Sequence, residues 1–182
     1  VVVKQYASGF CLSLLHQMHA ERDNPVILGH ESTGEVTKIG SEVKHVCPGD
    51  TVLVTWVPRN MTEGARTPEP AFLELPNGEK AYSENVFTWS DFTIADEQYV
   101  VKVSSEIDKE VTSIIGCAVM TGAGAVENTA NVKAGDSVAI YGVGGVGLSA
   151  VVAAKTLGAN PIIAIDLDEE KLAFARQFGA TH

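Results

Sequence analysis

The chain has 182 residues, 45% of them hydrophobic and 20% charged, a composition that supports a buried core and excludes a disordered tail. Its formal net charge of −10 argues against nucleic acid and anionic membranes as partners, because surfaces of like sign repel. No apolar run approaches the roughly 20 residues of a membrane span, no signal peptide is apparent, and the three scattered cysteines favour reduced thiols in a cytoplasmic protein over a disulfide framework.

The first part of the chain, to about residue 117, is typical of a β-rich domain. Short runs of β-forming residues predict strands at residues 1–4, 34–39, 51–57, 72–75 and 80–82. Residues 58–70 hold three prolines and no long apolar run, so we expect a loop there. The dipeptide Asn77-Gly78 predicts a tight hairpin between the last two strands, because both residues readily adopt positive φ.

From about residue 118 the pattern becomes helical and then alternates between strands and helices. It predicts helices at residues 118–132 and 145–157, strands at 137–141 and 161–165, and a last helix that follows Asp168 and ends at Gly179. The expected fold class is therefore α/β with a β-rich part. Residues 118–182 are expected to form the first half of a doubly wound parallel sheet.

A glycine-rich motif follows the strand at 137–141, with the spacing G-x-G-x-x-G. Gly142 allows a tight turn, Gly144 lets the backbone approach a pyrophosphate, and Gly147 lets helix and strand pack closely. The helix that begins at Gly145 and Val146 offers unpaired N–H groups to the phosphates. These residues predict a dinucleotide site of the Rossmann type.

The second strand of this region ends in an acid, Asp166, nineteen residues after Gly147. Such an acid accepts hydrogen bonds from the adenosine ribose hydroxyls and repels a 2′-phosphate, which favours NAD over NADP. The alternative interpretation is a plain strand-turn-helix whose aspartate faces solvent. The coincidence of strand, glycine motif, helix and acid favours the cofactor.

Spacing alone reveals no metal site. Cys11, His30 and Cys117 lie too far apart for a zinc-finger pattern. On residue type alone, Cys117 is interpreted as a buried small side chain and His30 as a hydrogen-bonded structural histidine.

Three segments resemble one known family. The run Gly29-His30-Glu31-Ser32-Thr33-Gly34, followed by Gly40 and Val43, is similar to the zinc signature of the zinc-dependent medium-chain alcohol dehydrogenases. Residues 9–16 and 116–126 resemble the segments that carry that family's other two zinc ligands. The resemblance covers nearly the whole chain, in order. It implies a GroES-like catalytic domain at residues 1–117 that lacks its first strands, and a truncated NAD-binding Rossmann domain at residues 118–182.

The resemblance also implies one catalytic zinc, held by Cys11, His30 and Cys117, with a fourth position open to the substrate oxygen. The zinc would stabilise an alkoxide, whose carbon passes a hydride to the nicotinamide. Because no cysteine lies between Cys47 and Cys117, the four-cysteine structural zinc of many relatives is not expected.

Further roles follow from matched positions. Ser13 matches the family's hydroxyl beside the substrate oxygen, and His16 matches the outer end of its proton relay. Glu31 matches an acid close behind the metal. Thr121 matches a residue beside the nicotinamide, and Lys171 one that contacts the adenosine ribose next to Asp166.

Two positions depart from the family pattern. Leu12 stands where a basic residue or a histidine often meets the pyrophosphate, and Leu14 stands where an aspartate usually orients the zinc-binding histidine. We therefore expect the second ring nitrogen of His30 to meet a backbone carbonyl, a water or another acid, with Glu31 nearest in sequence.

The resulting hypothesis is an NAD-dependent zinc alcohol dehydrogenase that converts a primary or aromatic alcohol to the aldehyde, or the reverse. Two alternatives stay open: a zinc-free quinone or enone reductase of the same superfamily, and a non-catalytic nucleotide-binding protein. The expected partners are a small-molecule substrate and, at full length, identical subunits in a homodimer or homotetramer. An isolated chain of this length is expected to be inactive.

Overall fold

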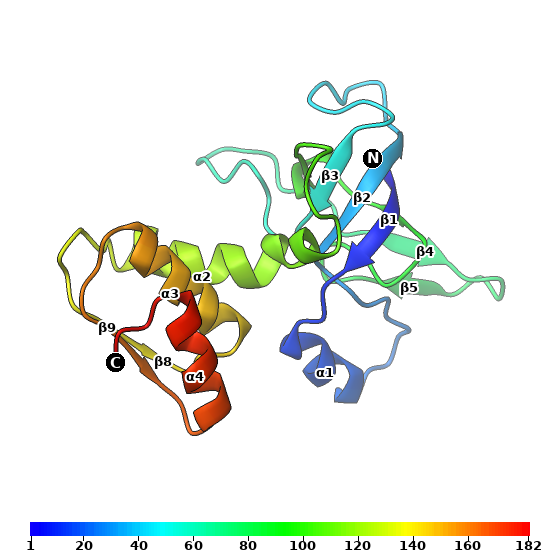
Figure 1. The fold of residues 1–182 in the computed structure, drawn as a ribbon. Coiled ribbons are helices and arrows are strands. Elements are labelled where there is room, and N and C mark those ends of the chain that lie inside the picture. Colours follow the sequence, from blue (N-terminus) through cyan, green and yellow to red (C-terminus); the bar gives the residue numbers. More distant parts are fainter. The chain divides into compact units, whose positions relative to one another are not determined.

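The computed structural model describes residues 1–182, which form two compact units. The N-terminal unit comprises Val1–Cys117 and the C-terminal unit Ala118–His182, and each is described by itself (Figure 1). None of the helices is both long and apolar enough to cross a membrane.

The N-terminal unit is built on an antiparallel sheet of five strands in the order β6-β1-β2-β3-β7. The strands are β1 (Val2–Ser8), β2 (Ser32–Lys38), β3 (Thr51–Val54), β6 (Phe92–Ile94) and β7 (Val100–Lys102). Valines fill the core beneath the sheet, among them Val3, Val36 and Val52. Ser32 pairs with Ser8 on one side and with Val54 on the other, so the end of β1, the start of β2 and the end of β3 meet.

The remaining elements of this unit are short. They are α1 (Leu12–His19), the hairpin strands β4 (Phe72–Glu74) and β5 (Lys80–Tyr82), and the 3-10 turns η1 (Glu97–Tyr99) and η2 (Val111–Ile114). The predicted hairpin is confirmed, since β4 and β5 pair antiparallel around Gly78, whose φ is +84°. Helix α1, which follows Cys11 directly, was not predicted from the sequence.

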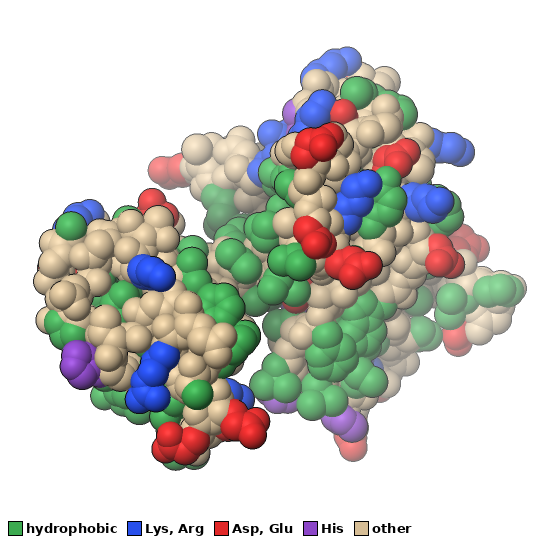
Figure 2. Space-filling view, in the orientation of Figure 1, with side chains coloured by type: hydrophobic (Ala, Val, Ile, Leu, Met, Phe, Trp, Pro, Cys, Tyr) green, Lys and Arg blue, Asp and Glu red, His purple; other side chains and the backbone are tan.

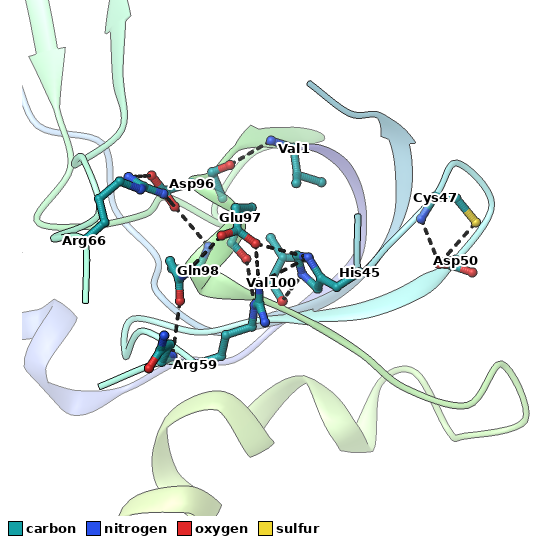
Figure 3. A network of polar contacts seen from close by, with 12 residues as sticks. Val1, His45, Cys47, Asp50, Arg59, Arg66, Asp96, Glu97, Gln98 and Val100 are labelled. Carbon is teal, nitrogen blue, oxygen red and sulfur yellow. Dashed lines mark hydrogen bonds and ion pairs between the residues drawn. The ribbon is translucent and has the colours of Figure 1, made fainter. Parts of the chain in front are cut away.

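The predicted loop at residues 58–70 has no helix or strand, but polar contacts anchor it to η1 (Figure 3). Arg66 donates two hydrogen bonds of 2.7 Å to the carboxylate of Asp96. Arg59 pairs with Glu97, which also lies 3.1 Å from Nδ1 of His45. The Arg66 guanidinium holds the pKa of Asp96 below its usual value.

The C-terminal unit begins with a helical segment that differs from the single α-helix predicted at 118–132. It comprises the π-helix η3 (Ile115–Val119), which starts in the N-terminal unit, then α2 (Met120–Gly124) and the π-helix η4 (Ala125–Thr129). The prediction was wrong in boundaries and helix type. The wider turns flank the short α-helical stretch that contains Gly122 and Gly124, as where Ala130 N donates to Ala125 O, five residues earlier.

The rest of this unit follows the predicted alternation. The elements are β8 (Val138–Tyr141), α3 (Gly145–Thr156), β9 (Ile162–Ile165) and α4 (Glu169–Phe178). Strands β8 and β9 are parallel, as a crossover through α3 requires. The Asp168 carboxylate accepts hydrogen bonds from the N–H groups of Glu170 and Lys171 and so caps α4. Beyond β9, Thr181 and His182 hydrogen-bond along its edge.

Candidate active site

The sheet register brings three distant segments together at one end of the N-terminal unit. Cys11 follows the end of β1, and His30 precedes the start of β2, its antiparallel neighbour. Just beyond the end of β3, the Thr55 hydroxyl donates a buried 2.7 Å hydrogen bond to the carbonyl of Gly116 and so anchors Cys117 at the same place. Strand pairing, rather than sequence spacing, therefore creates the cluster.

The potential ligand atoms of Cys11, His30, Glu31 and Cys117 all lie within 4.8 Å of one another. The two sulfur atoms are 3.8 Å apart. Two sulfurs that share a tetrahedral zinc at about 2.3 Å are about 3.8 Å apart, so the thiol pair already has the required separation. These four residues form the metal cluster discussed below.

The electrostatics of the cluster favour a cation. Burial, together with the charges of Glu31 and Cys11, raises the pKa of the Cys117 thiol to about 12, while a hydrogen bond with Trp56 opposes the rise. A divalent ion would reverse this shift, because it stabilises thiolate directly. Trp56 was not among the predicted site residues, and it lies at the cluster because it follows the end of β3 by two residues.

His30 is suited to act as a ligand in its neutral form. Burial lowers its pKa, and the opposing charge of Glu84 only partly compensates. Its Nε2 is buried without a hydrogen-bond partner, which is the state expected of a nitrogen kept for a metal. Leu14, at the position of the family's aspartate, is 1% exposed. The donor set of two sulfurs, an imidazole and a nearby carboxylate fits a zinc ion.

The other predicted catalytic residues lie on or beside the same segments. Ser13 Oγ donates to Cys11 Sγ at 3.2 Å, and His16 lies exposed on α1. Glu31 is buried, and it leaves no room for a side chain at Gly9, where a Cβ would come within 2.6 Å of its carboxyl carbon. Around α1, Figure 2 shows exposed apolar side chains, which include Phe10, Leu12, Leu15 and Met18.

The predicted nucleotide residues lie in the C-terminal unit. Asp166 follows β9 and accepts hydrogen bonds from Val143 N at 2.8 Å and from Asp168 N at 3.1 Å. The Val143 bond is the main reason why the pKa of Asp166 is lowered, and the charge of Lys171 adds to the effect. The acid therefore ties the glycine loop to the end of β9.

An open pocket of about 560 Å³ adjoins this loop, lined by Gly144 and Gly145 from the motif and by Lys171 and Phe174 from α4. Gly142, Gly144 and Gly145 are exposed and have no side chain, so their backbone can be reached from solvent, and Val146 is exposed as well. Thr121 is also exposed, on α2. The arrangement of turn, helix start and acid is that required for a dinucleotide phosphate and ribose.

Comparison with known proteins places these features in a family. The alcohol dehydrogenase GroES-like domain family matches residues 1–105, and the zinc-binding dehydrogenase family matches residues 145–182. An S-(hydroxymethyl)glutathione dehydrogenase of Escherichia coli O1:K1 / APEC is 36% identical over 178 residues, covering 86% of this chain and 48% of that protein.

Solved structures agree. An alcohol dehydrogenase zinc-binding domain protein from Burkholderia ambifaria is 31% identical with a TM-score of 0.87, and a benzyl alcohol dehydrogenase from Acinetobacter calcoaceticus is 30% identical with a TM-score of 0.83. Each comparison covers 100% of this chain and 55% of the other. The chain thus spans about half the length of these relatives, with a GroES-like β domain and the start of a Rossmann sheet. It belongs to the zinc-type medium-chain alcohol dehydrogenases.

Proposed function

We propose that the whole protein transfers a hydride between a primary or aromatic alcohol and NAD, at a catalytic zinc bound by Cys11, His30 and Cys117. The observation that carries the proposal is the convergence of these ligand atoms, with Glu31, to within 4.8 Å. In this proposal residues 1–117 are the catalytic domain and residues 118–182 the first part of the NAD-binding domain.

The chain's own residues would prepare the reaction in distinct ways. Two thiolates and a neutral imidazole balance the charge of the ion, and zinc, when bound, supplies the Lewis acidity that stabilises an alkoxide. Ser13, whose hydroxyl already lies 3.2 Å from Cys11 Sγ, would take the alcohol proton, and His16 on the same helix would pass it outward. Glu31 would tune the charge behind the metal.

The preference for NAD rests on Asp166. Its carboxylate stands at the end of β9, next to the glycine loop, and is anionic at neutral pH, as an aspartate with an ordinary or lowered pKa is. An anion there would accept the ribose hydroxyls and repel a 2′-phosphate. Lys171 is near enough to influence the same carboxylate, and it is proposed to contact the ribose.

The substrate class is supported by two relatives. One is named for S-(hydroxymethyl)glutathione and the other for benzyl alcohol, and both compounds carry a hydroxymethyl group. The exposed apolar residues around α1 are compatible with an aromatic or aliphatic alcohol. A zinc-free reductase is disfavoured because all three ligand residues are present and converge.

A substrate panel tests this proposal. Purified whole protein would be assayed with aliphatic, benzylic and S-hydroxymethyl alcohols, and with quinones and enones, each with both NAD and NADP coenzymes. The expected result is alcohol oxidation with NAD that a zinc chelator abolishes. Chelator-resistant reduction of quinones or enones would support the zinc-free reductase, and inactivity of a zinc-loaded, NAD-binding protein would support the non-catalytic alternative.

A further inference from the structure

The backbone around His30 is held at two carbonyl groups that flank it. On one side, the carbonyl of Leu28 accepts hydrogen bonds from the N–H groups of Thr88 at 3.2 Å and Trp89 at 3.1 Å. On the other side, the carbonyl of Glu31 accepts a hydrogen bond from Gly9 N at 3.0 Å. Residues far away in the sequence thus fix both ends of the segment that carries the histidine.

Two hydroxyl groups add to the hold on the Glu31 carbonyl. Ser8 Oγ donates to it at 2.9 Å, and Thr88 Oγ1 lies 3.3 Å from it and 2.8 Å from Ser8 Oγ. Each hydroxyl has a single proton to donate. The two shortest distances are satisfied together when Thr88 donates to Ser8 and Ser8 donates to the carbonyl, a chain in which each bond strengthens the next.

The same residues also hold the segment of the first cysteine. The indole N–H of Trp89 donates to the carbonyl of Gly9 at 3.3 Å, two residues before Cys11. Trp89 stacks on Phe10 with ring centroids 5.4 Å apart. Residues 88 and 89 therefore bridge the His30 segment and the Cys11 segment, which must keep a fixed separation if both are to reach one ion.

This backbone support matters because no carboxylate stands at the position from which the family usually orients this histidine. A metal-binding imidazole is ordinarily oriented by a carboxylate or carbonyl behind it. The buried Leu14 stands at the position where an aspartate is expected for that role. We propose that Ser8 and Thr88 form a hydroxyl clamp that positions His30, and with it Glu31, relative to Cys11. They are positioning residues that touch no substrate, and the inference rests on the proposed zinc site.

Matched variants of the whole protein separate this role from general stability. Thr88→Val removes the hydroxyl of residue 88 and Ser8→Ala that of residue 8, whereas Thr88→Ser keeps a hydroxyl at residue 88. The control is Thr93→Val, because Thr93 has the same exposure as Thr88, 1%, but its hydroxyl has no hydrogen-bond partner. Thr93 pairs with Val3, at the opposite end of β1 from Ser8.

The measurements are the zinc dissociation constant, by competition with a chromophoric chelator, and the visible spectrum of the cobalt-substituted protein. We expect Thr88→Val and Ser8→Ala each to weaken zinc binding about 10-fold or more and to alter the cobalt ligand-field bands. The double variant should lose little more than either single one, because both act on one carbonyl. Thr88→Ser and Thr93→Val should resemble the wild type.

Three results would overturn the clamp. If the wild type binds zinc tightly and Thr88→Val binds it equally well with an unchanged cobalt spectrum, the hydroxyls do not position the site. If Thr93→Val weakens zinc as much as Thr88→Val, the effect is general stability. A wild type that binds no zinc at all removes the proposed function as well, so the two failures are distinguishable.

Discussion

Replacing Gly147 with alanine puts a Cβ atom 1.9 Å from the carbonyl oxygen of Gly142 and 2.9 Å from its carbonyl carbon. Both atoms belong to the backbone of the turn between β8 and α3, so no flexible side chain can move aside. Ordinary contact between carbon and oxygen needs more than 3 Å, and α3 must therefore shift by about 1 Å from the end of β8. The substitution tests whether helix and strand owe their close packing to this glycine.

The magnitude follows from two opposing effects. Within a helix, alanine is favoured over glycine by up to about 1 kcal/mol. Forced overpacking typically costs about 1–3 kcal/mol, and a backbone contact this short belongs at the upper end of that range. We therefore expect a net loss of about 2 kcal/mol, which lowers the melting temperature by roughly 4–8 °C, since about 1 kcal/mol shifts the melting temperature by roughly 2–4 °C for chains of about 150–250 residues.

Gly144 supplies the matched control. A Cβ there meets nothing within 4 Å, and its φ of −73° suits any residue. Gly144→Ala should therefore leave thermal and denaturant unfolding unchanged, yet weaken NAD binding, because the pyrophosphate is proposed to approach this backbone. Calorimetry of unfolding and titration with NAD would measure both variants. A Gly147→Ala protein as stable as the wild type, or a Gly144→Ala protein with unchanged NAD affinity, would refute the reasoning.

Three other predictions concern single side chains. Asp166→Ala should weaken NAD binding and ease NADP binding, because the acid is proposed both to bind ribose hydroxyls and to repel phosphate; a wild type that already prefers NADP strongly would contradict this. Leu14→Asp should raise zinc retention in equilibrium dialysis against a chelator by giving His30 a carboxylate, and unchanged or weaker retention would mean that the site is already complete. Arg66→Met should reduce stability at neutral pH but not in strong acid. The arginine lowers the pKa of Asp96 in the folded state, so the ion pair stabilises the fold at pH values above the pKa that Asp96 has in the unfolded chain. This stabilisation is lost as the pH falls through the lower pKa of the folded state. If the stabilities of variant and wild type differed by the same amount at every pH, this prediction would be contradicted.

Local signals in the sequence were enough to predict the strand, glycine turn and capped helix of the C-terminal unit. Asp168 and Gly179, for example, mark the two ends of α4 by their own side-chain and backbone preferences. The short strands β6 and β7 were missed because three residues carry too little pattern, and their pairing with β1 and β3 depends on distant partners.

The site residues likewise depend on contacts between distant segments, which local signals in the sequence do not reveal. Cys11 and His30 were predicted only by family resemblance, because their proximity arises from the pairing of β1 with β2. The roles of Trp56, Ser8 and Thr88 depend on contacts between segments up to 80 residues apart, as between the two hydroxyls. No periodicity or spacing could have indicated them.

The most direct test of the account is the zinc content of the whole protein, measured by elemental analysis alongside a Cys117→Ser variant. The account predicts about one zinc per chain in the wild type, since one cluster is present and residues 48–116 contain no cysteine for a structural site. It predicts a large loss of zinc in the variant, whose serine oxygen is a poorer ligand than thiolate. A wild type without zinc, one with two zinc ions per chain, or a variant that retains its zinc undiminished would contradict it.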